Sequence, residues 1–372
     1  MKHISVMIKP ASSLCNLRCK YCFYEDESGI RENRSYGLMD EETMKAVITN
    51  VLSALTGNDE VTFAFQGGEP TLAGLTFFKN FIEYVNIEKS RNVKVSYVIQ
   101  TNATLLNDEW CEFFRENGFL VGVSLDLHKG SHDLVRASAD GNGTFEKVLE
   151  KVRLLEKHGA EFNILCTLTN EIAKYPRKVW DFIVKNDFKF VQFTPCLGSL
   201  SDGDRGKKEN GDNYALSPER FATFYKDIAD RWYIDFKNGD VRSIKLIDDI
   251  ANLVLFNKRT ACGIDGKCSP QIIVEADGSV FPCDFYCLDE YLIGNLANDD
   301  VLTLYERSAA SKTKDGKPLP DLCGSCKYLS ICGGGCKRMR ENICFNSDGE
   351  CSCGYRDFLD HLLPKLYSLR EM

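Results

Sequence analysis

The sequence lacks any uninterrupted apolar run approaching the length of about 18 residues that marks a membrane-spanning helix. Its first residues also lack the apolar core and the small-residue cleavage site of a secretory signal peptide. Positive charge is not in excess, because 46 Lys and Arg stand against 54 Asp and Glu, which gives a net charge of −8. We therefore expect a soluble, cytoplasmic protein with no membrane insertion and no nucleic-acid partner.

Cysteine, by contrast, is abundant, with 17 residues in a chain of 372. Without a secretory signal, this number indicates metal ligation in a reducing compartment and not a disulfide framework. The cysteines gather in two groups, within residues 15–22 and 262–353. Cys111, Cys166 and Cys196 occur singly in apolar patterns, where cysteine is usually a small core residue.

The first group reads Cys15-x3-Cys19-x2-Cys22 and follows the apolar run Ile4–Ile8. Three thiols at this spacing can hold one iron–sulfur cluster and leave one iron open to bind and activate a second molecule. A zinc site would need a fourth Cys or His nearby, and residues 23–40 contain neither. A zinc loop or three ordinary buried cysteines are the alternatives.

Strand and helix patterns alternate from the N-terminus to about residue 195. Apolar runs predict strands over Ile4–Ile8, Val61–Phe65, Val95–Ile99, Leu120–Leu125, Phe162–Thr167 and Phe190–Thr194. Helical periodicity lies between them, at about Asp40–Leu55, Leu75–Ile87, Asp108–Asn117, Thr144–His158 and Tyr175–Asn186. This order predicts a parallel α/β sheet with functional residues at the carboxyl ends of its strands, either a barrel or a doubly wound open sheet.

The remaining chain reads as a polar linker, two helices and a cysteine-rich module. Ser199–Asn213 has almost no apolar residues and predicts a surface linker, whereas Pro218–Phe236 and Val241–Phe256 look helical. Ser269–Pro282 reads as a small hairpin, which metal sites would have to stabilise. The expected parts are a barrel over 1–198, a linker with bridging helices over 199–257, and a cysteine-rich domain with a C-terminal helix over 258–372.

The motif Cys15-x3-Cys19-x-Tyr21-Cys22 resembles the signature of the radical S-adenosylmethionine (SAM) superfamily. The resemblance implies a partial (β/α)6 TIM-type barrel and one [4Fe-4S] cluster on these three thiols. Its open iron would chelate SAM, and one electron would cleave SAM to a 5′-deoxyadenosyl radical. We expect electrons from a donor such as flavodoxin or ferredoxin.

Further strand ends match the same superfamily. Gly67-Gly68-Glu69-Pro70 resembles the segment that holds the SAM amino group, Ser124 would meet the ribose or methionine portion, and Arg136 the carboxylate. The cofactor-binding residues implied are Tyr21, Gly68, Glu69, Ser124, Arg136 and Leu197. Alternatively, the glycine pair is an ordinary turn and Arg136 a solvated loop cation. The strand ending at Ser124 continues as Leu125-Asp126-Leu127-His128, where the family usually has Gly-Pro after the aspartate.

The C-terminal cysteine spacing resembles the SPASM domain, which carries two auxiliary [4Fe-4S] clusters; zinc is the alternative. The resemblance assigns one cluster to Cys262, Cys268, Cys283 and Cys336. It assigns the other to Cys323, Cys326, Cys332 and a late cysteine, for which Cys353 is slightly preferred over Cys351. Cys287 and Cys344 fit neither set.

The stretch Pro282-Cys283-Asp284-Phe285-Tyr286 resembles the anaerobic sulfatase-maturating enzymes. This resemblance implies that Asp284 takes the proton of a substrate thiol or alcohol during oxidation of a sulfatase Cys or Ser to Cα-formylglycine. We expect Tyr24 and Gln66 to contact the peptide substrate. Three alternatives remain: a maturase that crosslinks ribosomally made peptides, a zinc- or cluster-binding interaction protein without catalysis, and an Asp284 that merely forms a turn or surface ion pair.

Overall fold

The computed structural model describes residues 3–200, 214–311, 319–347 and 350–370, and the chain divides into two compact units. Unit 1 consists of Met1–Ser124, Arg136–Phe162 and Pro270–Asp315. Unit 2 consists of Leu125–Val135, Asn163–Ser269 and Gly316–Met372. Most of the expected linker, residues 201–213, lies outside the described residues. No helix in the described part of the chain is both long and apolar enough to cross a membrane.

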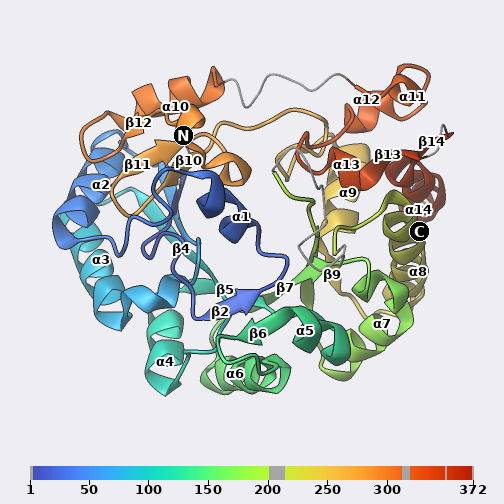
Figure 1. Cartoon of the computed structure of the whole chain (residues 1–372), viewed down its shortest axis with the longest axis horizontal. Helices are drawn as coiled ribbons and strands as arrows, with labels where there is room; N and C mark the ends of the chain where they lie inside the picture. The colour runs from blue at the N-terminus through green and yellow to red at the C-terminus, as the bar shows by residue number, and fades with distance from the viewer. Residues whose placement is uncertain (1–2, 201–213, 312–318, 348–349, 371–372) are drawn as a thin grey trace. The chain divides into compact units, whose positions relative to one another are not determined.

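Unit 1 is built on a sheet whose strand order is β12-β11-β10-β1-β3-β4-β5. Figure 1 labels β12, β11, β10, β4 and β5 of this sheet. Its strands are β1 (His3–Ile8), β3 (Glu60–Phe65), β4 (Lys94–Thr101), β5 (Phe119–Ser124), β10 (Ile272–Val274), β11 (Ser279–Phe281) and β12 (Gly294–Asn295). β10, β1, β3, β4 and β5 are parallel, and β11 and β12 are added antiparallel. A short separate ladder joins β2 (Leu17–Cys19) to β6 (Arg136–Ser138).

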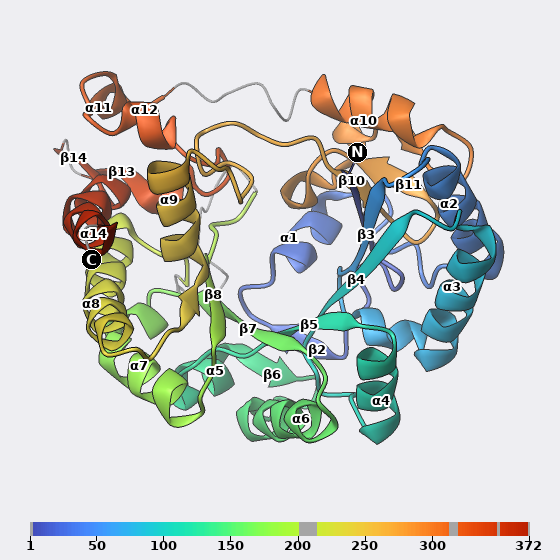
Figure 2. The same cartoon turned by 180° about the vertical axis from the view of Figure 1, so that it is seen from behind.

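The helices of unit 1 lie between or after these strands in the chain. They are α1 (Phe23–Ile30), α2 (Glu41–Ser53), η1 (Pro70–Ala73), α3 (Leu75–Glu88), α4 (Asp108–Glu116), α6 (Phe145–His158), η3 (Asp284–Tyr286), η4 (Asp289–Tyr291) and α10 (Val301–Ala309). Figure 2 shows α2, α3 and α4 on one side of β3, β4 and β5, as in a barrel and not a doubly wound sheet. Aromatic rings fill the space between, and the Phe65 ring packs on Phe78 and Phe81 with centroids 5.0 Å apart in each pair.

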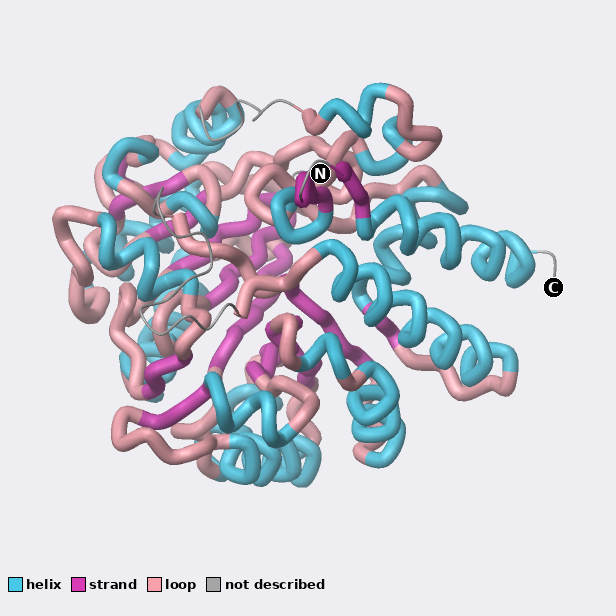
Figure 3. The backbone as a smooth tube through the Cα atoms, turned by 45° about the vertical axis from the view of Figure 1, so that its right-hand side comes forward, coloured by secondary structure: helices cyan, strands magenta, loops and turns pink. Residues whose placement is uncertain are grey.

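Unit 2 continues the strand–helix alternation that Figure 3 shows by colour. Its elements are α5 (Lys129–Val135), β7 (Phe162–Leu168, whose first residue belongs to unit 1), η2 (Ile172–Lys174), α7 (Pro176–Lys185), β8 (Phe190–Pro195), α8 (Pro218–Lys237), β9 (Ser243–Ile244), α9 (Lys245–Phe256), α11 (Asp321–Gly324), α12 (Leu329–Cys332), α13 (Arg340–Ile343), β13 (Cys344–Ser347), β14 (Glu350–Cys353) and α14 (Gly354–Arg370). β7, β8 and β9 pair in parallel. The Phe358 ring of α14 packs on Tyr225 of α8 at 5.1 Å.

The structure confirms every strand and helix predicted before residue 195, and the ends differ by a few residues. It differs over Val241–Phe256, where a short strand, β9, precedes a helix that begins only at Lys245. It also differs at the hairpin, because β10 pairs with β1 and is fully buried there. The hairpin is therefore stabilised by the sheet of unit 1 and does not depend on metal alone. The two units cut across the expected boundaries 1–198, 199–257 and 258–372, which remain predictions.

Candidate active site

The cysteine loop follows β1 and lies against the loop that follows β3. Gly68 donates its N–H to the carbonyl oxygen of Ser12 at 2.8 Å, and Glu69 donates its N–H to that of Leu14 at 2.7 Å. A Cβ added at Gly68 would lie 2.1 Å from the Leu14 carbonyl oxygen, so only glycine fits. The close approach that the glycine pair allows is thus to the cysteine loop itself, which these backbone bonds hold in place.

Glu69 is fully buried and braces the same loop. Its Oε1 accepts hydrogen bonds from the Thr71 N–H at 3.1 Å, the Thr71 hydroxyl at 2.6 Å and the Thr101 hydroxyl at 2.7 Å. Its Oε2 accepts from the Asn102 N–H at 2.7 Å. Burial raises the pKa of Glu69, and these hydrogen bonds oppose the rise. The carboxylate therefore ties two strand ends together, and its predicted contact with SAM remains a prediction.

Asn102 is a residue at this site that the sequence analysis missed. It directly follows β4, and its side-chain amide donates to Asn16 Oδ1 at 2.9 Å and lies 3.8 Å from the Cys15 sulfur. A polar residue at the carboxyl end of a parallel strand is the signal that could have found it.

Arg136 lies in a strand and is not the solvated loop cation that was considered as an alternative. It is 9% exposed, and the β6–β2 register places it opposite Cys19. Its guanidinium lies over the Tyr21 ring, 5.4 Å from the centroid. The structure thus brings two predicted cofactor-binding residues against the strand that carries a predicted cluster ligand.

The remaining donors of unit 1 fit a cluster that binds SAM. Cys15, Cys19 and Cys22 lie within one short segment that includes β2, and all three are partly exposed and outside any disulfide. Ser124 ends β5 and is buried. Leu197 lies in unit 2 after β8, so its binding of the cofactor remains a prediction, as do the cluster and SAM roles of the others.

Asp284 begins the short turn η3 and is buried, so it does not form a surface ion pair, and its role as the base remains a prediction. Its Oδ2 accepts a hydrogen bond from the Tyr24 hydroxyl at 2.8 Å and one from the Gln66 amide at 3.2 Å. The same amide donates to the Tyr24 oxygen at 2.6 Å. Asp284, Tyr24 and Gln66, predicted as base and substrate contacts, thus form one hydrogen-bonded group in unit 1.

Tyr24 keeps its proton in this group. Burial raises the pKa of the phenol well above its usual range, and the negative charge of Asp284 raises it further. The hydroxyl is therefore a hydrogen-bond donor to the carboxylate.

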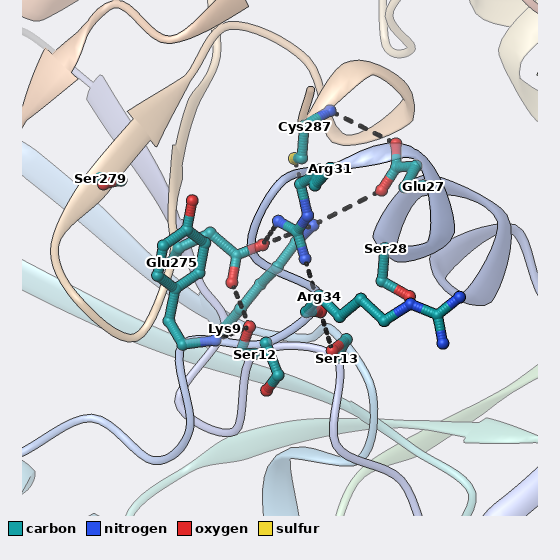
Figure 4. A network of polar contacts seen from close by, with 12 residues as sticks. Lys9, Ser12, Ser13, Glu27, Ser28, Arg31, Arg34, Glu275, Ser279 and Cys287 are labelled. Carbon is teal, nitrogen blue, oxygen red and sulfur yellow. Dashed lines mark hydrogen bonds and ion pairs between the residues drawn. The ribbon is translucent and has the colours of Figure 1, made fainter. Parts of the chain in front are cut away.

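A buried charged network adjoins this group and was not predicted from the sequence (Figure 4). The Lys9 ammonium lies 3.3 Å from Asp284 Oδ1, 3.6 Å from Glu275 and 3.9 Å from Glu27. Arg31 forms a second ion pair with Glu275 at 2.7 Å. Burial lowers the pKa of Lys9, but the surrounding anionic groups outweigh it and hold that pKa well above its ordinary value.

Cys287 belongs to this network. This agrees with the sequence analysis, which assigned Cys287 to neither auxiliary cluster. Its thiol is fully buried, lies 3.1 Å from the Lys9 ammonium and packs with Ile273 and Phe281. Burial raises its pKa well above the ordinary value. Cys283, the predicted cluster ligand before Asp284, is partly exposed at the start of η3.

The altered turn after Ser124 is accommodated by burial and stacking in unit 2. Leu127 is 1% exposed, and the Asp126 carboxylate accepts the Thr167 N–H at 2.9 Å. The His128 ring stacks on Tyr175 with centroids 4.4 Å apart.

Unit 2 contains a cavity of about 260 Å³ that is lined by most of the predicted auxiliary-cluster ligands. These are Cys262, Cys323, Cys326, Cys332, Cys336 and Cys353. Aromatic and aliphatic side chains, including Phe193, Leu322 and Ile343, form much of the remaining wall. Thiolates around an otherwise largely apolar space fit iron–sulfur clusters, which the protein holds through sulfur.

The position of Cys353 supports the preference for it as the late ligand. It is 6% exposed and lines the cavity, whereas the side chains of Cys344 and Cys351 are outside the description. Cys283 lies in unit 1 while Cys262, Cys268 and Cys336 lie in unit 2. The grouping of these four on one cluster remains a prediction.

Comparisons with known proteins agree with this geometry. Residues 10–181 match the radical SAM superfamily, and residues 266–327 match an iron–sulfur cluster-binding domain, SPASM. The chain is 39% identical over 373 residues to a cysteine-type anaerobic sulfatase-maturating enzyme from Clostridium perfringens, covering 99% of both proteins. The chain belongs to the anaerobic sulfatase-maturating enzymes.

Two further relatives place the chain within this family. A serine-type anaerobic sulfatase-maturating enzyme from Bacteroides thetaiotaomicron is 31% identical, with 100% of this chain and 92% of that protein covered. The solved structure of native anSMEcpe with bound AdoMet, which is SAM, and Cp18Cys peptide superimposes with a TM-score of 0.87 at 37% identity, covering 99% of each chain. As a member of the anaerobic sulfatase-maturating enzymes, the chain is a radical SAM enzyme with the radical SAM α/β fold and a SPASM domain. The match to an iron–sulfur domain overturns the zinc alternative.

Proposed function

We propose that this protein oxidises a cysteine of a sulfatase polypeptide to Cα-formylglycine in the absence of oxygen. The identity of 39% to a cysteine-type relative, against 31% to a serine-type one, favours a cysteine target. The single observation that carries the proposal is the buried Asp284 carboxylate, which is hydrogen-bonded to Tyr24 and Gln66 beside a predicted cluster ligand.

When bound, SAM and the cluster on Cys15, Cys19 and Cys22 would supply the radical that removes a hydrogen atom from the substrate Cβ, and an auxiliary cluster would take up one electron. Asp284 would accept the thiol proton, so that one hydrogen atom, one proton and one electron leave the side chain together. A carbon–sulfur double bond results, and water then replaces the sulfur to give the aldehyde and hydrogen sulfide.

Tyr24 and Gln66 would orient both partners of this proton transfer. Both donate to Asp284 Oδ2, which leaves the lone pairs of that carboxylate fixed in direction. Arg136, on its short strand against Tyr21, would hold the SAM carboxylate through paired hydrogen bonds. An electron donor of the flavodoxin or ferredoxin type would reduce the cluster.

Asp284→Asn tests the proposal, because asparagine keeps the side chain's size but cannot take the proton. Anaerobic reactions with SAM, dithionite and matched peptides carrying Cys or Ser would be followed for both 5′-deoxyadenosine and formylglycine. We expect 5′-deoxyadenosine to form still, while formylglycine falls by about 10²- to 10⁴-fold. Near wild-type oxidation of either peptide by an iron-replete variant would refute Asp284 as the base.

The choice of cysteine as the target is tested separately, by comparing the rates at which the wild-type enzyme oxidises the Cys and Ser peptides. Faster oxidation of the Cys peptide is expected, and exclusive oxidation of the Ser peptide would overturn the choice of cysteine while leaving Asp284 in its role.

A further inference from the structure

Lys9 lies directly after β1, is 2% exposed, and is the cation of unit 1 that contacts Asp284. We propose that Lys9 is a positioning residue, whose ammonium holds Oδ1 and so fixes the Asp284 carboxylate in the orientation in which Oδ2 meets Tyr24 and Gln66. This inference rests on the proposed role of Asp284 as the base.

The two oxygens of Asp284 have different partners. Oδ2 accepts from Tyr24 at 2.8 Å and from Gln66 at 3.2 Å. Oδ1 is buried without a hydrogen bond among the described residues, and its charged neighbour there is the Lys9 ammonium at 3.3 Å. The ammonium attracts Oδ1, while Tyr24 and Gln66 donate to Oδ2. Rotation of the carboxylate would break these contacts, so the group is held in one orientation.

Lys9 also fixes the orientation of Tyr24. Its ammonium lies over the Tyr24 ring, 4.7 Å from the centroid, while the hydroxyl of the same ring bonds to Asp284. Such an interaction contributes more when it is desolvated, as it is here. One cation therefore orders both partners of the hydrogen bond to Oδ2.

The ammonium is itself held by groups on separate elements. Glu27 lies on α1, Glu275 follows β10 and Cys287 follows η3, all within 3.9 Å of Lys9 Nζ. Glu275 is fixed in turn by the Ser12 hydroxyl at 2.7 Å and by Arg31 at 2.7 Å (Figure 4). A side chain that is enclosed on this many sides has one available position, which suits a positioning residue.

A purely structural role for Lys9 must be separated from this one. The network joins two cations, Lys9 and Arg31, to three carboxylates, Glu27, Glu275 and Asp284. Removing Lys9 alone leaves buried charge uncompensated, which destabilises proteins strongly. The single variant Lys9→Met can therefore fail by misfolding.

At a pH above about 8, where Glu27 is ionised, the charge-matched variant Lys9→Met/Glu27→Gln removes one positive and one negative charge and leaves the net charge of the network unchanged. Methionine keeps the length and packing of the lysine stem. It would be compared with Glu27→Gln, which retains the Lys9 contact to Asp284. Lys94→Met, at a lysine of β4 whose side chain is 72% exposed, is the matched surface control.

The measured quantity is formylglycine formed per 5′-deoxyadenosine, with iron content and melting temperature as controls for folding. We expect this ratio to fall by about 10²-fold in Lys9→Met/Glu27→Gln relative to Glu27→Gln, since misplacing a reacting group costs this much. The KM for the peptide should stay within a few-fold, because Lys9 does not reach the surface. A simple loss of structure would lower both products together and leave their ratio unchanged.

Asp284→Asn then separates the two proposals. If Lys9 acts through Asp284, adding the Lys9→Met/Glu27→Gln pair to Asp284→Asn should cause no further loss of formylglycine. An additional loss, or an unchanged product ratio in the iron-replete charge-matched variant, would overturn the positioning role alone. Full oxidation by Asp284→Asn would instead refute the proposed base, and with it the function on which this inference rests.

Discussion

The cysteine loop of unit 1 and the cysteine-lined cavity of unit 2 hold their thiols in different surroundings. Buried polar groups brace the loop, chiefly the Glu69 carboxylate with its four hydrogen bonds. Cysteines, aromatic rings and aliphatic side chains make up much of the cavity wall. The comparison indicates that the loop is shaped before a cluster binds, whereas the cavity depends on its clusters for part of its stability.

Removal of one thiol from the loop should have the largest effect. Cys19→Ala should lose about four of about twelve irons, because one four-iron cluster is lost, and should form no 5′-deoxyadenosine. Iron analysis and product assay after anaerobic reconstitution measure both. Cys111→Ala, at a buried cysteine of α4, is the control and should keep its iron. SAM cleavage by Cys19→Ala would contradict the assignment of the loop.

Removal of one thiol from the cavity should cause a similar loss of iron but should leave SAM cleavage intact. Cys353→Ala should also lose about four irons, while Cys351→Ala keeps them, because Cys353 lines the cavity. 5′-Deoxyadenosine should still form in Cys353→Ala. Loss of iron from Cys351→Ala in place of Cys353→Ala would reverse the choice of late ligand.

If Glu69 stabilises the cysteine loop before a cluster binds, its removal should lower the free energy of unfolding. Glu69→Ala leaves the buried N–H groups of Thr71 and Asn102 without their acceptor, at about 1–3 kcal/mol for each group. A lower melting temperature of the protein before cluster loading is the expected result. Glu88→Ala, exposed on α3, should lie within about 0.5 kcal/mol of wild type. Equal stability of both variants would show that the loop is not braced before metal binds.

Unit 1 should also be sensitive to pH through the buried Glu27 carboxylate. Burial raises the pKa of Glu27 from 4.5 to about 8, although Lys9 opposes the rise. The folded state then binds more protons than the unfolded state between these values, so stability should fall as pH rises through this window. Lys9, Asp284 and Arg31 are the charged groups facing Glu27.

Glu27→Gln should remove this part of the slope, which melting temperatures across the window would measure. Glu88→Gln should keep the wild-type slope. A wild-type slope in Glu27→Gln would show that another group causes the pH dependence.

Sequence reasoning succeeded where a signal is local. Apolar runs found the strands, and the spacing of Cys15, Cys19 and Cys22 found a metal loop, because both are written within a few consecutive residues. Asp284 was found in the same way, from its neighbours. The strand β6, only three residues long, has no periodicity to detect, so Arg136 was expected in a loop.

The network around Lys9 could not be found by such reasoning. Lys9 and Glu275 meet because β1 and β10 pair in parallel, and no local pattern in either segment predicts that partner. A lysine that follows an apolar strand is usually exposed to solvent. Lys9 can be recognised as a buried cation only once the hairpin 272–281 is known to pair with β1.

The same pairing has a consequence for synthesis. Val6 is synthesised well before its β10 partner, Ile272, which is added 266 residues later. At about 5–20 residues per second, the interval is tens of seconds. Throughout it, one edge of β1 has no β10 to pair with, and the nascent chain carries the cysteine loop without the Glu275 and Asp284 side chains that complete its surroundings. The order of translation therefore makes the proposed active site one of the last parts of unit 1 to form.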